Sequence, residues 1–279
     1  MKTLLQCLSN PRQVCHSAWN QARTKMRRFL LDLRHKLAGQ TIWTQHQGFW
    51  LPYHGDGDLQ EIYYQIGGGM WIAELKEKLT DWLHEGDVVV DVGANMGFTA
   101  LVFSSLVGSS GRVVAFEPSP WIYPRLVDVI RKNGLEHQVE CLNLGCGTSA
   151  KTETLMVPVS SGNATIKRDG VTLSGAVREM ELHIDTLDQV LLPRLSRLDF
   201  LKIDTEGFED QVLAGGTETI RRFQPVIYIE LSQEYGESSE RAINWLQNNG
   251  YSFEKLPNLE EAHNGDNFIA YPANRKLPD

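Results

Sequence analysis

A run of apolar residues that ends in a carboxylate and a glycine-spaced turn constrains the fold of this chain. Residues 88–90 are all valine and lead to Asp91, a turn with Gly93 and Gly97 follows, and a second apolar stretch covers residues 98–107. This pattern predicts a buried parallel strand that runs into a tight loop and then into a helix. Open α/β sheets bind adenosyl cofactors at such a place, beside the N-terminus of the helix.

The spacing of the glycines distinguishes between cofactors. A dinucleotide fingerprint, G-x-G-x-x-G, that began at Gly93 would require glycines where Asn95 and Phe98 stand. The loop instead reads D-x-G-x-N-x-G, through Asp91, Gly93, Asn95 and Gly97. This spacing suits the amino-acid end of S-adenosylmethionine and argues against a nicotinamide dehydrogenase.

A second predicted strand carries a carboxylate at the position that such a cofactor needs. Residues 112–117 form a short, mostly apolar segment that ends in Glu117, 20 residues after Gly97. A carboxylate at the end of this strand can accept hydrogen bonds from both ribose hydroxyls. The loop and Glu117 together therefore predict a site for S-adenosylmethionine.

Predicted strands and helices alternate along the rest of the chain. This order predicts an α/β fold with a doubly wound, Rossmann-like sheet, mostly parallel, with an antiparallel strand near the C-terminus. We expect a β-rich insertion at 151–186. We expect further strands at 138–144, 200–203, 226–231, 251–256 and 267–272, and helices at 71–83, 98–107, 120–133 and 238–248.

The charge of the chain is divided unevenly. Residues 1–40 contain eight Lys or Arg and one Asp, whereas residues 41–279 have a net charge of −15. A body this acidic is a poor partner for nucleic acid, whose binding relies on clustered Lys and Arg. We therefore expect a small molecule or a glycan as the substrate.

Within the basic segment, residues 17–38 have the apolar spacing of an amphipathic helix. Such a helix could pack on the rest of the protein or on a second copy, or it could lie on an anionic membrane or a partner. No apolar run approaches the roughly 18 residues of a membrane span. The four cysteines, Cys7, Cys15, Cys141 and Cys146, show no metal-finger spacing. We expect reduced thiols and a cytoplasmic protein, peripheral to the membrane if the second interpretation of 17–38 holds.

Further segments complete a recognisable series. Residues 201–209 read Leu-Lys-Ile-Asp-Thr-Glu-Gly-Phe-Glu, and other distinctive segments stand at 86–97, 111–119, 186–188, 212–215 and 225–230. In these segments, and in their order, the chain resembles the FkbM-type S-adenosylmethionine-dependent methyltransferases over residues 70–272. The resemblance implies the class I methyltransferase fold and methyl transfer to hydroxyls of sugars or other natural products.

The resemblance also implies roles for individual residues. It places Asp91, Gly93, Asn95 and Gly97 around the methionine moiety and Glu117 on the ribose. Asn143 and Gly145, at the end of the third strand, would border the adenine. Asp204, at the end of the fourth strand, would face the sulfonium and the acceptor.

A sugar-like hydroxyl needs a base or a metal ion to help remove its proton. We predict Asp204 as the base and place Glu206 and Lys202 with it in the catalytic set. Asp204, Glu206 and Glu230 could alternatively hold a divalent cation through oxygen ligands. For Glu209 we favour a helix cap, and we rank His183 and His54 below the carboxylates as bases.

These observations predict three parts of the chain: a basic helical extension at 1–45, a hairpin and helix at 46–85 that border the pocket entrance, and a methyltransferase domain at 86–279. The hairpin is expected between apolar stretches at 48–53 and 62–66, around Asp-Gly turn signals at 55–58. We expect an O-methyltransferase that acts on a hydroxyl of a sugar, glycolipid or secondary metabolite. The alternative is a non-catalytic methyltransferase-like module that docks through its basic N-terminal helix.

Overall fold

The computed structural model describes residues 31–32, 35–36, 40–54, 72–158, 165–166, 177–232, 236–256 and 265–275. The chain divides into two compact units, residues 1–69 with 160–162 and residues 70–159 with 163–279. Most of the predicted helix at 17–38 lies outside the described residues, although 31–32 and 35–36 are helical. The predicted turn at 55–58 and strand at 62–66 also lie outside them.

The first unit contains an antiparallel hairpin of β1 (Ile42–His46) and β2 (Phe49–Tyr53). Its turn is formed by Gln47 and Gly48, both with positive φ, of 48° and 88°, as a tight two-residue hairpin turn requires. Residues 49–53 thus pair with the segment before them, and the predicted pairing with 62–66 lies outside the described residues. The expected boundary at 45/46 falls inside this hairpin.

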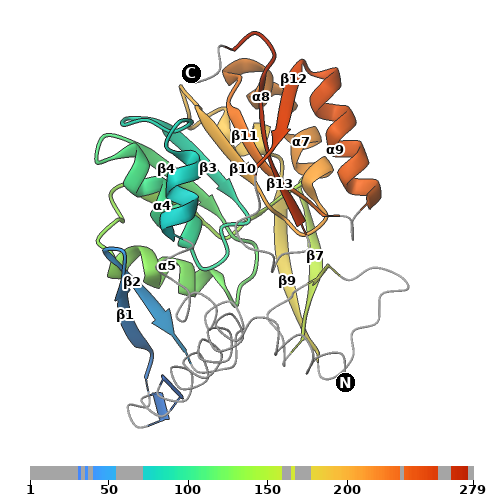
Figure 1. Cartoon of the computed structure of the whole chain (residues 1–279). Helices are drawn as coiled ribbons and strands as arrows, with labels where there is room; N and C mark the ends of the chain where they lie inside the picture. Colours follow the sequence, from blue (N-terminus) through green and yellow to red (C-terminus); the bar gives the residue numbers. More distant parts are fainter. Residues whose placement is uncertain are drawn as a thin grey trace, which may run out of the picture. The chain divides into compact units, whose positions relative to one another are not determined.

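The second unit is built on a seven-stranded sheet (Figure 1) in the order β12-β13-β11-β10-β3-β4-β5. Neighbouring strands from β5 to β11 are parallel, and β13 runs antiparallel to both β11 and β12. This confirms the predicted doubly wound sheet with an antiparallel strand near the C-terminus. The strands are β3 (Val88–Val92), β4 (Arg112–Phe116), β5 (Val139–Leu142), β10 (Phe200–Ile203), β11 (Val226–Ser232), β12 (Tyr251–Lys255) and β13 (Gly265–Pro272).

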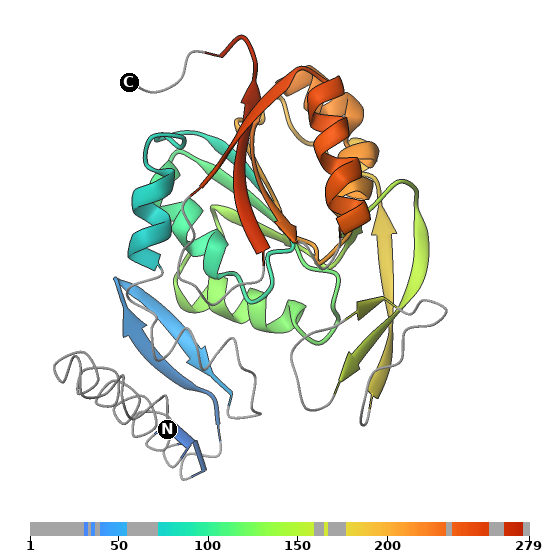
Figure 2. The same ribbon diagram turned by 45° about the vertical axis from the view of Figure 1, so that its right-hand side comes forward.

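Helices cover both faces of this sheet, and α4 and α9 lie on opposite faces (Figure 2). They are α4 (Phe98–Val107), α5 (Tyr123–Lys132), α6 (Leu187–Leu191), α7 (Glu209–Gly215), α8 (Thr217–Phe223) and α9 (Gly236–Asn248). Residues 72–79 are also helical, within the helix predicted at 71–83. Among the described residues, no helix combines the length and the apolar character needed to span a membrane.

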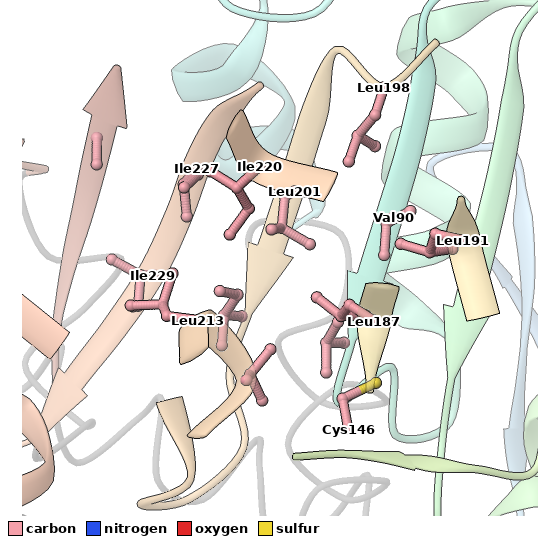
Figure 3. Packing of buried hydrophobic residues seen from close by; sticks show 14 of the residues in the cluster. Val90, Cys146, Leu187, Leu191, Leu198, Leu201, Leu213, Ile220, Ile227 and Ile229 are labelled. Carbon is pink, nitrogen blue, oxygen red and sulfur yellow. The ribbon is translucent and has the colours of Figure 1, made fainter. Parts of the chain in front are cut away.

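A large apolar core fills the space between one face of the sheet and helices α6 to α9 (Figure 3). Leu187, Leu191, Leu213 and Ile220 of the helices pack there against strand residues that include Val90, Leu201, Ile227 and Ile229. Successive side chains of a strand point to opposite faces. The residues between these apolar positions therefore point to the face that carries α4, and they include Asp91, Lys202 and Tyr228.

The predicted β-rich insertion forms a separate four-stranded sheet in the order β6-β9-β7-β8. Its main pairing joins β7 (Lys151–Pro158) to β9 (Val177–Asp185) in antiparallel orientation. The remaining strands are β6 (Gly145–Cys146), which is parallel to β9, and β8 (Thr165–Ile166).

Candidate active site

The candidate site lies where the strand order reverses. The central strands β3 and β10 are neighbours, with Val92 opposite Ile203, but the chain continues from β3 to β4 on one side and from β10 to β11 on the other. The loops that follow these parallel strands therefore meet at one edge of the sheet. This is the crevice in which open α/β sheets bind ligands.

The loop after β3 is fixed by its glycines. Gly93 has a φ of 79°, and a Cβ at this position would lie 1.8 Å from the carbonyl oxygen of Asp204. Gly97 has a φ of 87°, and a Cβ there would lie 2.6 Å from Cδ1 of Leu126. The loop also accommodates Asn95 at a φ of 50°. Only residues without a side chain can turn at 93 and 97, because neighbouring elements approach the backbone there.

Glu117 follows β4 and is joined to this loop. Its carboxylate accepts hydrogen bonds from the backbone N–H of Asn95 (3.0 Å) and of Ser119 (2.8 Å). Burial raises the pKa of Glu117 to about 7, against the lowering effect of these two hydrogen bonds and of the Lys202 charge. The glycine loop and the acidic strand end, which are separate in the sequence, thus form one continuous surface.

Lys202 is the buried cation of the site. Its side chain is 2% exposed, and Nζ lies 3.1 Å from Oδ1 of Asp91 and 3.3 Å from Oδ2 of Asp204. Nζ also donates a hydrogen bond to the carbonyl oxygen of Gly93 (3.0 Å). Burial alone would lower the pKa of Lys202, but the charges of Asp204 and Asp91 outweigh it and raise this pKa. The side chain therefore stays charged and links the glycine loop to the end of β10.

Asp91 is enclosed by its partners. Its side chain is 0% exposed, and Oδ2 accepts a hydrogen bond from Oγ1 of Thr99 (2.6 Å), in the first turn of α4. Asp91 thus supports the glycine loop from the protein interior, and its buried carboxylate offers no exposed oxygen to a ligand. The sequence analysis missed Thr99, whose only signal is a hydroxyl in the first turn of an otherwise apolar segment.

Asp204 and Glu230 form a carboxyl pair at the ends of the adjacent strands β10 and β11. The residues directly before them, Ile203 and Ile229, are paired in the register of these strands, and the pKa of Glu230 is raised to about 9, first by burial and then by the nearby carboxyl group of Asp204. Asp204 remains 33% exposed. Glu206, whose charge also raises the pKa of Glu230, is exposed and has a φ of 56°. This left-handed conformation is uncommon for a residue with a side chain.

Glu209 is structural. Its buried Oε1 accepts hydrogen bonds from the backbone N–H groups of Thr205 (3.0 Å) and Gly207 (3.1 Å), and from Oγ1 of Thr205. Glu209 is the first residue of α7, so its carboxylate closes the loop that carries Asp204 and Glu206. These donors precede α7, which has no side-chain cap, so Glu209 braces the loop before the helix and does not cap the helix as predicted.

The structure also locates the other residues that the sequence indicated as candidates. The side-chain amide of Asn143 donates to the carbonyl oxygens of Glu117 (2.9 Å) and Pro118 (3.1 Å), and so holds the loop after β4. Gly145 is packed closely, since a Cβ there would lie 3.2 Å from Cγ1 of Ile184. His183 is exposed on the four-stranded sheet and contacts Oγ1 of Thr152 (3.2 Å). His54 belongs to the first unit.

The described residues contain no group of three or more His, Cys, Asp or Glu side chains arranged to hold a metal ion. Asp204, Glu206 and Glu230 are not among such groups, and the divalent cation that they could hold stays a prediction.

Part of this chain is similar to a curated protein. The chain is 30% identical over 158 residues to "Methyltransferase sdnD" of Sordaria araneosa, a match that covers 47% of this chain and 60% of that protein. The chain thus spans less than two thirds of the length of this curated relative.

Solved structures are similar at low identity. One is methyltransferase FkbM from Methylobacillus flagellatus KT, with 14% identity, a TM-score of 0.48 and coverage of 75% of this chain and 52% of that one. Another is the O-methyltransferase from Bacillus cereus in complex with SAH, with 16% identity, a TM-score of 0.47 and coverage of 71% and 78%.

The family comparison covers more than half of the chain. The sequence model of the methyltransferase FkbM domain matches residues 91–253, from Asp91 in β3 to Phe253 in β12. This range contains Glu117, Lys202, Asp204 and Glu230. The chain therefore belongs to the methyltransferase FkbM domain family.

Proposed function

We propose that this protein is an S-adenosylmethionine-dependent methyltransferase that methylates a hydroxyl group of a sugar, a glycolipid or a secondary metabolite. The observation that carries the proposal is the contact between the glycine loop and Glu117, through the hydrogen bond from the N–H of Asn95. This hydrogen bond holds the loop, which has glycine at positions 93 and 97, beside the buried carboxylate of Glu117. Family membership supports the same donor.

The residues present fit the donor. Gly93 and Gly97 let the loop turn close against Asp204 and Leu126, and a tight loop of this kind after the first strand suits the amino-acid end of the molecule. Glu117 can accept hydrogen bonds from the ribose hydroxyls, which favours its ionised form. Asn143 supports this loop from the end of β5 through its contacts with Glu117 and Pro118.

When bound, S-adenosylmethionine supplies an electrophilic methyl group, and the protein has to orient the acceptor and remove its proton. Asp204 is suited to the second task, because it lies at the crevice, is partly exposed and contacts the cation of Lys202. Lys202 is a positioning residue in this proposal: its buried, charged side chain holds both Asp204 and the carbonyl of Gly93.

The charge of the acidic body favours a neutral small molecule or glycan over nucleic acid as the acceptor. We propose a cytoplasmic protein, on the basis of its reduced thiols. For the basic segment at 17–38 the proposal has two alternatives: packing on the protein or on a second copy, and contact with an anionic membrane or a partner. Co-sedimentation of the chain with anionic liposomes, compared with a chain that lacks residues 1–40, tests the membrane contact, and equal binding of the two would refute it.

Two measurements test the methyltransferase proposal. Isothermal titration with S-adenosylhomocysteine and with NAD should give binding of the first alone. A methyl-donor assay against a panel of sugars and extracted glycolipids, read by mass spectrometry, should identify the acceptor. Binding of NAD in place of S-adenosylhomocysteine would contradict the proposal.

Asp204→Asn should abolish turnover on that acceptor, because the amide cannot take up the proton, while S-adenosylhomocysteine still binds. Asp266→Asn is a matched control, since Asp266 forms an ion pair with Lys255 in which both side chains are partly exposed. This variant should turn over normally. Normal turnover of Asp204→Asn would remove Asp204 as the base. If the wild-type protein and Asp266→Asn both bind S-adenosylhomocysteine but methylate nothing, the result would favour the non-catalytic module.

A further inference from the structure

The hydroxyl of Thr99 binds a side chain of the neighbouring strand. A Ser or Thr in a helix commonly returns its hydroxyl to a carbonyl oxygen of the preceding turn, as Ser104 of α4 does to Ala100 (2.7 Å). Thr99, the second residue of α4, instead donates from Oγ1 to Oδ2 of Asp91 (2.6 Å). The first turn of α4 is thus joined to a buried carboxylate of β3.

This hydrogen bond fixes the orientation of the Asp91 carboxylate. The terminal torsion of an aspartate side chain is broad and roughly two-fold, so the carboxylate turns easily unless a partner holds it. Oδ2 is held by Thr99, and Oδ1 lies 3.1 Å from Nζ of Lys202. Among the described residues Oδ1 has no hydrogen-bond partner, so the Lys202 ammonium is its compensating charge. Thr99 therefore determines the direction in which the second oxygen of Asp91 meets Lys202.

The ammonium of Lys202 is fully used within the protein. It carries three N–H groups, and three oxygens lie around Nζ: the carbonyl oxygen of Gly93 at 3.0 Å, Oδ1 of Asp91 at 3.1 Å and Oδ2 of Asp204 at 3.3 Å. The side chain is 2% exposed. A change in the direction of the Asp91 carboxylate therefore shifts Nζ relative to both Gly93 and Asp204.

The glycine loop has further contacts that keep its shape. The N–H groups of Gly93 and Ala94 donate to the carbonyl oxygen of Phe116 (3.1 and 2.9 Å), and the N–H of Asn95 donates to Glu117 (3.0 Å). These bonds join the loop to the end of β4 without the help of Lys202. The loop, and with it the expected place of the donor, therefore stays in position when Nζ shifts.

The carboxylate of Asp204 depends on Lys202 more strongly than the loop does. The N–H of Asp204 donates to the carbonyl oxygen of Val92 (3.1 Å), which holds its main chain at the end of β10. This bond does not orient the side chain, which is 33% exposed and has Oδ2 beside Nζ of Lys202. The ammonium is a fixed point for this carboxylate, because the lysine side chain is buried. The position of Nζ therefore sets the direction of the carboxylate.

We propose that Thr99 is a positioning residue for methyl transfer: through Asp91 it sets the place of the Lys202 ammonium, and through Lys202 the direction of the Asp204 carboxylate. This inference rests on the proposed function, in which Asp204 takes the proton of the acceptor hydroxyl. The effect belongs to the transfer step and not to donor binding, because the glycine loop keeps its own contacts. A displacement of about 1 Å caused by a change outside the reacting groups can reduce a rate by about a hundredfold.

Thr99→Val removes the hydroxyl and keeps a branched side chain of similar size. At saturating S-adenosylmethionine, kcat on the acceptor that the mass-spectrometric panel identifies should fall by about ten- to a hundredfold. The Kd of S-adenosylhomocysteine, measured by isothermal titration, should stay at the wild-type value. Thr99→Ser keeps the hydroxyl and loses the methyl group, and it should restore kcat.

The matched control is Thr219→Val on α8. Thr219 is 0% exposed, and its hydroxyl has no hydrogen-bond partner among the described residues, so the same exchange removes a buried hydroxyl without breaking a hydrogen bond. Its kcat and Kd should equal those of the wild type. An unchanged kcat in Thr99→Val, or an equal loss in Thr99→Ser, would overturn the inference. Weaker binding of S-adenosylhomocysteine by Thr99→Val with a normal kcat would also overturn it, since Thr99 would then bind the donor directly.

Crystal structures of the wild-type protein and of Thr99→Val test the placement without any acceptor. In the variant the distance from Nζ of Lys202 to Oδ2 of Asp204 should exceed about 4 Å, the limit of an ion pair, while the glycine loop superposes on that of the wild type. Identical positions of Lys202 and Asp204 in the two structures would overturn the inference. A wild-type protein that binds no S-adenosylhomocysteine, or that binds it and methylates nothing, would instead contradict the proposed function.

Discussion

At Gly93 the chain turns with a φ of 79° while the carbonyl oxygen of Asp204 approaches its Cα. The effect of adding a side chain at this position can be separated from the effect of the left-handed backbone conformation. Gly134 has a similar φ of 69°, yet nothing lies within 4 Å of a Cβ built on it. The two glycines form a natural pair for comparison.

We expect Gly134→Ala to lower the free energy of unfolding by about 1 to 2 kcal/mol, the cost of a left-handed residue with a Cβ. Gly93→Ala should cost about 1 to 3 kcal/mol more, because the overlap with Asp204 forces the backbone to move. Urea denaturation measures both changes. Gly93→Ala alone should lose binding of S-adenosylhomocysteine, and equal behaviour of the two variants would show that the contact with Asp204 is not important.

Lys202 is predicted to matter for stability as well as for the site. Lys202→Met leaves the carboxylate of Asp91 buried without its cation, and removal of one partner of a buried pair costs about 3 to 5 kcal/mol. The control is Lys255→Met, because Lys255 is 51% exposed in its ion pair with Asp266 and such pairs contribute at most about 1 kcal/mol. Urea denaturation should show this contrast, and a similar small loss in both would mean that Lys202 does not stabilise the core.

The residues that form the site were predicted unequally well. Asp91, Gly93 and Glu117 stand at strand ends that apolar runs mark in the sequence, so their proximity follows from the parallel sheet. Lys202 was placed in the catalytic set because it belongs to the 201–209 block. Its burial between two carboxylates depends on the pairing of β3 with β10, which no local pattern specifies.

At the scale of elements, the segment at 186–188 connects two helices. Oγ1 of Thr186 accepts a hydrogen bond from the N–H of Gln189 and caps α6. The carboxylate of Asp188 accepts from the N–H groups of Glu218 (3.0 Å) and Thr219 (2.7 Å), in the first turn of α8. The part of the family resemblance at these residues therefore has a structural role.

Asp188→Ala should lower the free energy of unfolding by about 1 to 2 kcal/mol, because two N–H groups at the start of α8 lose their acceptor. Affinity for S-adenosylhomocysteine should not change. Asp128→Ala on α5 serves as the comparison, since this exposed residue forms only a surface ion pair with Arg131 and should change stability by less than about 0.5 kcal/mol. Chemical denaturation and ligand titration of both variants decide the matter, and a loss of ligand affinity in Asp188→Ala would contradict a purely structural role.

The hairpin of β1 and β2 was not predicted from the sequence. Asp-Gly at 55–58 is a strong turn signal, and it drew the prediction towards a pairing with 62–66, which lies outside the described residues. Gln47 and Gly48 provide a two-residue turn directly before residues 49–53. The positive φ of Gln47 is not marked by its residue type, so this turn became visible only in the structure.

At the scale of the whole molecule, the raised pKa values of the buried Glu117 and the partly buried Glu230 contribute to how stability depends on pH. The pKa of Glu117 is about 7 and that of Glu230 is about 9, against ordinary values of 4.5. Between pH 4.5 and each of the two raised pKa values, the native state retains a proton that the unfolded state has released. The free energy of unfolding supplied by these groups is fully present below about pH 4.5 and is lost as the pH rises through about 7 and then about 9.

We therefore expect the donor-free protein to become less stable between pH 6 and pH 9, measured by urea denaturation at several pH values. Glu230→Gln, which resembles the protonated side chain, should lose less stability over the upper half of this range. Glu254→Gln should follow the wild-type curve. A wild-type curve that rises with pH, or a Glu230→Gln curve that is parallel to it, would contradict the burial of these carboxyl groups.

The sequence alone determined the order of strands and helices, the glycine loop and the carboxylate of Glu117, because apolar periodicity and turn residues are local properties. The tertiary structure decided which distant groups meet. Lys202 and Gly93 are 109 residues apart in the chain and are joined only because β3 and β10 pair at the centre of the sheet. The carboxylates of Asp204 and Asp91 keep Lys202 charged, whereas burial raises the pKa of Glu117 and of Glu230. These effects depend on what surrounds each group in space, which is why the sequence indicated a set of carboxylates and the structure showed a buried cation among them.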